Sequence, residues 1–377
     1  MHYDFDSTAT SPVLPEVLAD YACQLGESAN NPASSHGGGL RAAGLLLEAR
    51  QRIASVLGCQ AGEVFFTSGG TESINLALKG AAWSLGRRPK AMLTTAGEHE
   101  AVLASLDYIR EKEGFSLTLV PLLAEGSLDQ EALVQVLEAQ LPGLVSILAV
   151  SNETGAINDL DKLLPMIRRL APQAIIHSDL VQAGGKFPFS FKKSGLDLAS
   201  FSGHKLGAPK HTGLLLKRRG LTLTPLHHGG GQEEGLRSGT VDVPGALALA
   251  RALEIHDQAM VANLAKVREL RQDFLDQLKA DLTPHKVISP SDGSPYVLAL
   301  AFPGLRGETL MHALSAENIY ISTGSACSSK KAGDNRVLAA MGLDKASILS
   351  SVRISFQPDQ SREDVLMLAE RIGALHA

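Results

Sequence analysis

Four short polar segments of the sequence contain the groups that a covalent amine catalyst needs. Lys205 ends the segment Ser202-Gly203-His204-Lys205, and Glu98-His99 supplies an imidazole. Asp179 adds a carboxylate, and Gln182 follows it closely. Ser68-Gly69-Gly70-Thr71 precedes a helix-like segment, so its backbone N–H groups and hydroxyls can bind an anion. Together these groups are able to hold an anionic ring compound through a covalent bond to the lysine amine.

Each of these segments follows a short apolar stretch that is typical of a buried β-strand. The stretches are residues 64–67, 91–94, 117–122, 144–150, 174–177, 198–201 and 213–217. Between most of them lie segments of helical length with apolar residues three and four positions apart, at residues 72–83, 100–113, 129–140 and 160–170. This alternation predicts an α/β fold with a mainly parallel seven-stranded sheet covered by helices on both faces.

The polar segments, and Asn152 after residues 144–150, lie where these strands end, which is where ligands bind in open α/β sheets. Each residue alone has an ordinary structural explanation, because lysines are usually solvated, loop histidines bond locally and aspartates often cap helices. Together they match what pyridoxal phosphate requires: an anion cradle, a stacking ring, a carboxylate for the pyridine nitrogen and a lysine for the Schiff base. The sequence therefore predicts this cofactor, and it lacks the GxGxxG and GxxxxGK[ST] motifs of nucleotide sites.

The overall composition excludes several other classes of function. Of the 377 residues, 44% are hydrophobic, and 35 basic residues against 40 acidic ones give a net charge of -5. This balance provides no broad basic field for nucleic acid, and no apolar run approaches the roughly 18 residues that a membrane helix needs. The start, MHYDFDSTAT, has no signal-peptide pattern. We therefore expect a cytoplasmic protein that binds neither nucleic acid nor membranes directly.

The pattern changes near residue 244, which indicates a second domain. A long helical segment at residues 246–278 is followed by a smaller α+β region. Its expected elements are a strand at 296–302, a helix at 308–317, a loop at 322–335, a strand at 351–356 and a helix at 361–375. We expect a large domain of residues 13–250 and a small C-terminal α+β domain made of residues 1–12 and 251–377.

The three cysteines, Cys23, Cys59 and Cys327, form neither a disulfide framework nor a CxxC metal pattern. Cys23 and Cys59 are expected to pack as small hydrophobic side chains. Cys327 lies in a segment of Gly, Ser, Lys and Ala, residues 323–331, which is typical of an exposed loop, and nearby lysines favour its thiolate. The histidines at 211, 227 and 228 lack the regular spacing of zinc ligands, so no metal is expected.

Nine ordered motifs, spread over nearly the whole chain, resemble those of the cysteine desulfurases of the class V aminotransferase group. They are Phe5-Asp6-Ser7-Thr8-Ala9-Thr10, Asn31-Pro32-Ala33-Ser34-Ser35-His36, Thr67-Ser68-Gly69-Gly70-Thr71-Glu72-Ser73, Glu98-His99, Asn152-Glu153, Asp179 with Gln182, Ser202-Gly203-His204-Lys205, Arg237-Ser238-Gly239-Thr240 and Gly324-Ser325-Ala326-Cys327. The resemblance implies the type I fold of pyridoxal-phosphate enzymes and the mobilisation of sulfur from L-cysteine.

The resemblance also implies a role for each residue of the cofactor site. Lys205 matches the lysine of the Schiff base, and His99 matches the residue stacked on the cofactor ring. Asp179 matches the partner of the pyridinium nitrogen, and Gln182 matches the donor to the phenolate oxygen. The positions that match the phosphate cradle are Gly70, Thr71, Ser202 and His204. In this family the threonine that matches Thr240 reaches the phosphate from the neighbouring subunit, so the resemblance predicts a homodimer.

For the substrate, the resemblance implies that Asn31, Asn152 and Arg353 hold the carboxylate of L-cysteine, with Asn152 also beside the cofactor. Cys327 then attacks the substrate sulfur, which leaves a persulfide on the enzyme and releases L-alanine, while His99 serves as acid-base group for the substrate thiol. The segment from Cys327 to Val337 resembles the long-loop housekeeping and nitrogen-fixation branch. The expected persulfide acceptor is an iron–sulfur scaffold protein or a sulfur carrier for tRNA thiolation.

Two other interpretations remain open at this point. The chain could be a pyridoxal enzyme with a different reaction, a transaminase or a C–S or C–Se lyase, in which Cys327 is incidental. It could also be a non-catalytic relative that serves as a binding scaffold, although the presence of Lys205, Asp179 and His99 argues against this. Departures from the family pattern at Ser7, Leu180-Val181 and His211-Thr212 remove no group that the reaction needs.

Overall fold

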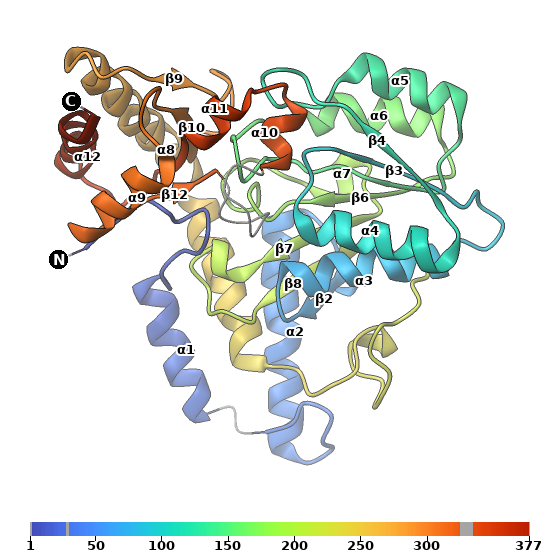
Figure 1. Cartoon of the computed structure of the whole chain (residues 1–377). Helices are drawn as coiled ribbons and strands as arrows, with labels where there is room; N and C mark the ends of the chain where they lie inside the picture. The colour runs from blue at the N-terminus through green and yellow to red at the C-terminus, as the bar shows by residue number, and fades with distance from the viewer. Residues whose placement is uncertain (1, 28–29, 325–334, 377) are drawn as a thin grey trace.

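A seven-stranded sheet forms the centre of the larger part of the molecule (Figure 1). The computed structural model describes residues 2–27, 30–324 and 335–376. In spatial order the strands are β2 (Val64–Thr67), β8 (Gly213–Lys217), β7 (Leu198–Ser202), β6 (Ile175–Asp179), β5 (Leu144–Ser146), β3 (Ala91–Thr95) and β4 (Ser116–Val120). Among these strands, β8 runs antiparallel to both of its neighbours, β2 and β7, and the other pairs are parallel. The predicted mainly parallel seven-stranded sheet is confirmed.

Alternate residues of each strand face opposite sides of the sheet, and both sides are covered. On one side Met92 of β3 packs in a core with α3 (Gly70–Trp83) and α4 (Glu100–Glu113). On the other side its neighbour Leu93 packs in a core with α2 (Gly37–Leu57), α5 (Gln130–Ala139), α6 (Leu160–Leu170) and the first part of α8 (Val243–Ala280). Short α7 (Phe191–Ser194) precedes β7. Helices therefore cover both faces, as the α/β pattern predicts.

The smaller part contains a four-stranded sheet in the order β12, β13, β10, β9. These strands are β12 (Ser322–Thr323), β13 (Ser351–Ser355), β10 (Val297–Ala301) and β9 (Lys286–Val287), and each neighbouring pair is antiparallel. The helices of this part are α9 (Gly307–Ala316), α10 (Arg336–Ala340), α11 (Lys345–Leu349) and α12 (Arg362–His376). The N-terminal β1 (Tyr3–Asp4) pairs with β11 (Ile319–Tyr320), so both chain ends lie beside this part (Figure 1).

Helix α8, with 38 residues, joins the two parts. Leu249, near its start, is buried in the core of the large sheet, whereas Phe274, near its end, is buried in the second core with Phe5 and Phe356. The helix predicted at residues 246–278 is thus confirmed with slightly wider bounds. The proposed domain boundaries at residues 12/13 and 250/251 stay a prediction.

Two features differ from the sequence-based expectations. The helices α1 (Pro15–Glu27) and α2, which extend away from the sheet in Figure 1, were not predicted. The strand expected at residues 144–150 is formally β5 alone, although Ala149 N–H still donates to the Asp179 carbonyl at 3.1 Å, so the chain stays extended beside β6. None of the helices in the described ranges is long and apolar enough to cross a membrane.

Candidate active site

A cavity of about 690 Å³ opens at the carboxyl ends of β6 and β7. The structure brings ten of the predicted site residues together in its lining: Gly70, Thr71, His99, Asn152, Asp179, Gln182, Ser202, His204, Lys205 and Arg353. Another cavity of about 710 Å³ lies beside α6 and residues 183–190 and contains none of the predicted residues. The chemistry predicted from the sequence therefore concentrates in the first cavity.

One end of this cavity is suited to an anion. Helix α3 begins there at Gly70, and Gly69 before it has φ 145° and provides no side-chain cap, so the first N–H groups of the helix are left for a ligand. A Cβ at Gly70 would lie 3.0 Å from Val181 Cγ2, so a side chain there would crowd Val181. Thr71 and Ser202 add hydroxyl donors to the same lining. This donor set fits a phosphate group.

His204 borders the anion-binding end as a neutral side chain. Its Nδ1 lies 3.0 Å from Thr10 Oγ1. Burial, with the positive charges of Lys205 and Lys210, lowers the pKa of His204 to about 4. The imidazole is therefore uncharged at neutral pH and binds by hydrogen bonding.

Lys205 lies in the tight turn Gly203–Lys205 that directly follows β7. Its Nζ donates to the carbonyl of Thr8 at 2.6 Å and also to the carbonyl of Ala9. The amide Nε2 of Gln182 donates to the same Thr8 carbonyl at 3.2 Å. The N-terminal segment thus holds the lysine amine and the glutamine amide side by side.

Asp179, the last residue of β6, and His99, which follows β3, line the same cavity. Asp179 is only 2% exposed, and its Oδ1 accepts from the N–H of Val181 at 2.8 Å. Burial raises the pKa of Asp179, an effect that His99 and Lys205 partly offset. A protonated ring nitrogen would supply the positive partner that this buried carboxylate favours.

Helix α4 fixes the ring of His99. The residue is the N-cap of the helix, and its Nδ1 accepts from the N–H of Ala101 at 3.1 Å. Because Nδ1 is an acceptor, the neutral imidazole carries its proton on Nε2. The catalytic group predicted from the sequence is therefore also a structural cap.

Arg353 and Asn152 form the other end of the cavity. Arg353 belongs to β13 and is 2% exposed, and its guanidinium donates to the Asn152 carbonyl at 3.1 Å and to Asp6 Oδ1 at 2.8 Å. The amide of Asn152 is held in turn by Glu153 at 3.1 Å. A buried guanidinium beside a side-chain amide is suited to binding a carboxylate.

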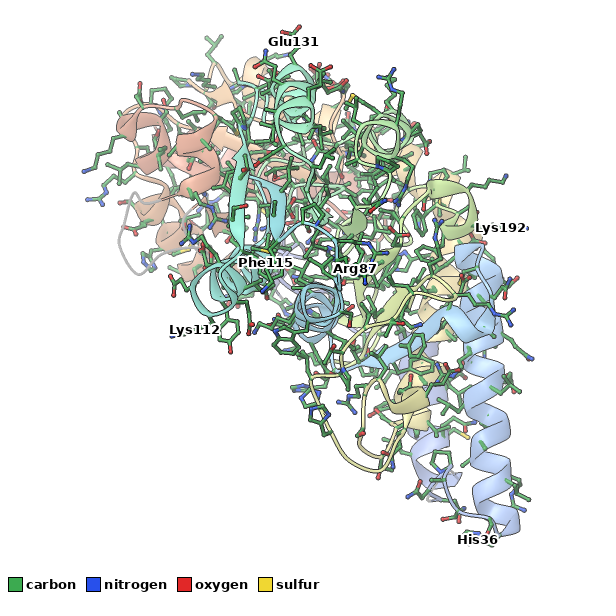
Figure 2. All side chains as sticks on the ribbon, turned by 90° about the vertical axis from the view of Figure 1, so that its right-hand side faces the viewer. His36, Arg87, Lys112, Phe115, Glu131 and Lys192 are labelled. Atoms are coloured by element: carbon green, nitrogen blue, oxygen red, sulfur yellow. The ribbon has the colours of Figure 1, made fainter. Side chains whose placement is uncertain are left out.

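Two predicted residues, Thr240 and Asn31, do not line this cavity, and a third is not described by the structure. Thr240 lines a separate cavity of about 240 Å³. Asn31 is exposed, with Oδ1 accepting from Ala33 N–H, and its segment leads to His36 at the far tip of α2 (Figure 2). Cys327 lies outside the described residues. The roles of all three stay predictions.

Other residues of the lining received no role from the sequence. Thr8 and Thr10 belong to a motif that was noted only as a matching segment, and Lys210 belongs to none of the nine motifs. His211 lies in the left-handed region with φ 64°, which glycine adopts most easily. The departure from the family pattern at His211-Thr212 was a signal that marked this position in the sequence.

Comparisons with known proteins give matches over nearly the whole chain. The Aminotransferase class-V family matches residues 3–368. The chain is 38% identical to an "IscS-like cysteine desulfurase" of Mycobacterium tuberculosis, over 96% of this chain and 92% of that protein. It is 36% identical to "Cysteine desulfurase, mitochondrial" of Drosophila melanogaster, over 97% and 79%.

A solved structure described as a "NIFS-LIKE PROTEIN" superposes on the fold with a TM-score of 0.93 at 36% identity, covering 100% of this chain and 99% of that one. The agreement of family, sequence and fold extends over the whole cavity, from the N-terminal segment to β13. The chain therefore belongs to the class-V aminotransferase family and, within it, to the cysteine desulfurases.

Proposed function

We propose that this protein is a pyridoxal-phosphate-dependent cysteine desulfurase. The reaction converts L-cysteine and an enzyme thiol into L-alanine and an enzyme persulfide, so that all atoms balance. The observation that carries the proposal is that Lys205, Asp179 and His99 line the same cavity as the Asn152–Arg353 pair.

The residues of the cavity fit the cofactor in its chemistry. The start of α3 with Thr71 and Ser202 would hold its phosphate, Asp179 its ring nitrogen, and Lys205 its aldehyde carbon. Pyridoxal phosphate, when bound, supplies a carbonyl that condenses with amines and a ring that withdraws electrons from the substrate carbon. The orphaned donors at the start of α3 and the desolvated Asp179 are the two features that such a group would satisfy.

The chain's own groups bind the substrate and move its protons. Arg353 and Asn152 hold the carboxylate of L-cysteine, which aims its α-hydrogen at a fixed point in the cavity. Lys205 Nζ takes the α-proton, since the lysine amine is the mobile base nearest to the Schiff-base position. His99 exchanges a proton with the substrate thiol through Nε2, because Nδ1 is used by α4.

In this proposal Cys327 is the nucleophile of the sulfur transfer. Its thiolate attacks the substrate sulfur, an S–S bond forms, the C–S bond breaks, and the carbon is protonated to give alanine. Cys59 is a poor alternative, since burial and the nearby Glu63 raise the pKa of its thiol to about 12. Cys23 is exposed on α1.

A homodimer is part of the proposal. Thr240 and Asn31 lie outside the cavity of their own chain, so a second copy would have to bring them to it. The persulfide acceptor is proposed to be an iron–sulfur scaffold protein or a sulfur carrier for tRNA thiolation. We propose the cytoplasm as the location, because thiols stay reduced there.

Incubation with L-cysteine, followed by intact-mass spectrometry and an alanine assay, tests the function. The native protein is expected to release alanine and to gain the mass of one sulfur atom, and Cys327→Ala to do neither. Cys59→Ser is the matched control and should behave like the native protein. Equal alanine release or other turnover by Cys327→Ala would instead identify a lyase or transaminase. A native protein that binds no cofactor would exclude the desulfurase as well as these two alternatives.

A further inference from the structure

Lys186 lies four residues after Gln182, in the turn that follows β6. Its Nζ donates to Gln182 Oε1 at 2.9 Å. A glutamine amide has an oxygen at one end and a nitrogen at the other, so it can present either an acceptor or a donor to a ligand. A neighbour that only donates, such as a lysine ammonium, selects one of these two orientations.

The two contacts of the Gln182 amide agree with each other. Oε1 accepts from Lys186, and Nε2 donates to the Thr8 carbonyl, which also accepts from Lys205 Nζ at 2.6 Å. The nitrogen end therefore lies beside the lysine of the predicted Schiff base. An amide nitrogen has two N–H groups, and within the described residues only Thr8 takes one of them, so the other remains for a ligand in the cavity.

The Lys186 side chain is positioned by an aromatic residue of the small core. Its Nζ lies 5.4 Å from the ring centroid of Tyr296, which is 7% exposed, and Phe187 packs edge-on against the same ring. His256 of α8 also faces it, and no carboxylate of the described ranges lies within ion-pair distance. Burial and Lys205 lower the pKa of Lys186 to about 7. A neutral amine still donates N–H groups, so the contact with Gln182 persists in both protonation states.

We propose that Lys186 is a positioning residue that turns the N–H end of the Gln182 amide toward the cofactor's phenolate oxygen. Without this contact the amide can turn over and present its oxygen, which repels the negative charge of the phenolate. This inference rests on the proposed function, because it requires pyridoxal phosphate in the cavity. The inference predicts that substitution of Lys186 changes the bound cofactor only through the Gln182 amide.

The test compares native protein, Lys186→Met, Lys186→Arg and the control Lys217→Met, each loaded with pyridoxal phosphate. Lys217 also packs over an aromatic ring, that of Phe65 at 5.0 Å, but it does not line the cavity. The readouts are the visible absorption of the bound cofactor against pH and its dissociation constant. K186M is expected to raise the pH at the midpoint of the absorption change by about one unit. It is also expected to raise the dissociation constant of the cofactor about tenfold. K186R and K217M should match the native protein.

A double-substitution experiment separates positioning from a general structural effect. In a Gln182→Ala background, K186M should cause no further shift of the midpoint, because the amide through which it acts is gone. Additive shifts, or an unchanged midpoint in K186M alone, would overturn the inference. If K186M does not fold, Tyr296→Leu should give a smaller shift in the same direction and Tyr296→Phe none. Failure of the native protein to bind the cofactor would overturn the proposed function itself.

Discussion

Arg353 and Asp6 form an ion pair of 2.8 Å that joins β13, an inner strand of the small sheet, to the N-terminal segment. The guanidinium is almost completely buried, and it also donates to the Asn152 carbonyl. The N-terminal segment also carries the Thr8 carbonyl that holds Lys205. One short stretch of chain therefore aligns the substrate end of the cavity and the amine end.

Asp6→Ala should weaken substrate binding more than turnover. The buried guanidinium loses its charged partner and its orientation, so KM for L-cysteine is expected to rise about tenfold with kcat changed less than about threefold. The free energy of unfolding should fall by about 1–3 kcal/mol, because Asp6 is partly exposed. Initial rates and urea unfolding measure the two effects.

The matched control for this substitution is Asp273→Ala. Asp273 pairs with Arg362 at 2.8 Å, but Arg362 is 64% exposed and the pair lies far from the cavity. Surface pairs contribute about 0–1 kcal/mol, so neither KM nor stability should change much. Equal KM values for Asp6→Ala and native protein would contradict the alignment role.

Lys205→Ala should abolish turnover and the covalent retention of the cofactor. Loss of a nucleophile and base reduces rates by about a thousandfold or more. Because only non-covalent contacts then hold the cofactor, it should dissociate slowly from the protein during gel filtration. Absorbance of the filtered protein and alanine formation are the measurements. The exposed Lys192→Ala serves as control and should keep both properties.

His99 variants should separate its structural role from its chemical role. His99→Ala and His99→Asn both lose the imidazole, so both should lose about a hundredfold or more in activity. Asparagine can still accept from the Ala101 N–H, so His99→Ala should be less stable than His99→Asn by about 1 kcal/mol. Urea unfolding at neutral pH resolves this difference, and equal stabilities would argue against the cap.

His177 should make the protein less stable in acid. It is fully buried between Ser146 and Ser200, and burial lowers its pKa to about 3 from a usual 6.5. The unfolded chain takes up a proton below pH 6.5 and the folded chain does not, so this contribution is complete above pH 6.5 and is lost as pH falls. Between pH 6.5 and 5 the loss is about 2 kcal/mol.

His177→Asn removes this titration. Its free energy of unfolding should start lower at pH 7, because two hydrogen bonds change, but should fall less steeply with acid than that of the native protein. Parallel curves of unfolding free energy against pH for the two proteins would show that His177 is accessible to protons in the folded state.

The sheet and its site were largely predictable from the sequence because short, buried strands need apolar residues and the polar groups follow directly at their ends. Asp179 is the last residue of β6, and Lys205 and His99 follow a few residues after β7 and β3. Arg353 was different: nothing local marks a buried arginine in a strand, and it came from the resemblance alone.

What the sequence missed depends on contacts between distant segments. Helix α1 packs on α8, which lies far away in the sequence, and it leaves Leu18 and Leu25 exposed. Thr8 contributes a backbone carbonyl, which no side-chain pattern can indicate. Lys186 and Gln182 are four residues apart, a spacing that the sequence shows. The position of the Tyr296 ring beside the Lys186 amine, which comes from a distant segment, is visible only in the structure.

Helix α8 sets the distance and the rotation between the two hydrophobic cores. Leu253 belongs to the large core and Val267 to the small one, while Val261 between them is 83% exposed. Inserting one residue there would turn everything beyond it by about 100° and advance it by about 1.5 Å, which would carry Arg353 away from Asn152. Along this stretch, evolution is therefore free to change the identity of the exposed residues but not their number.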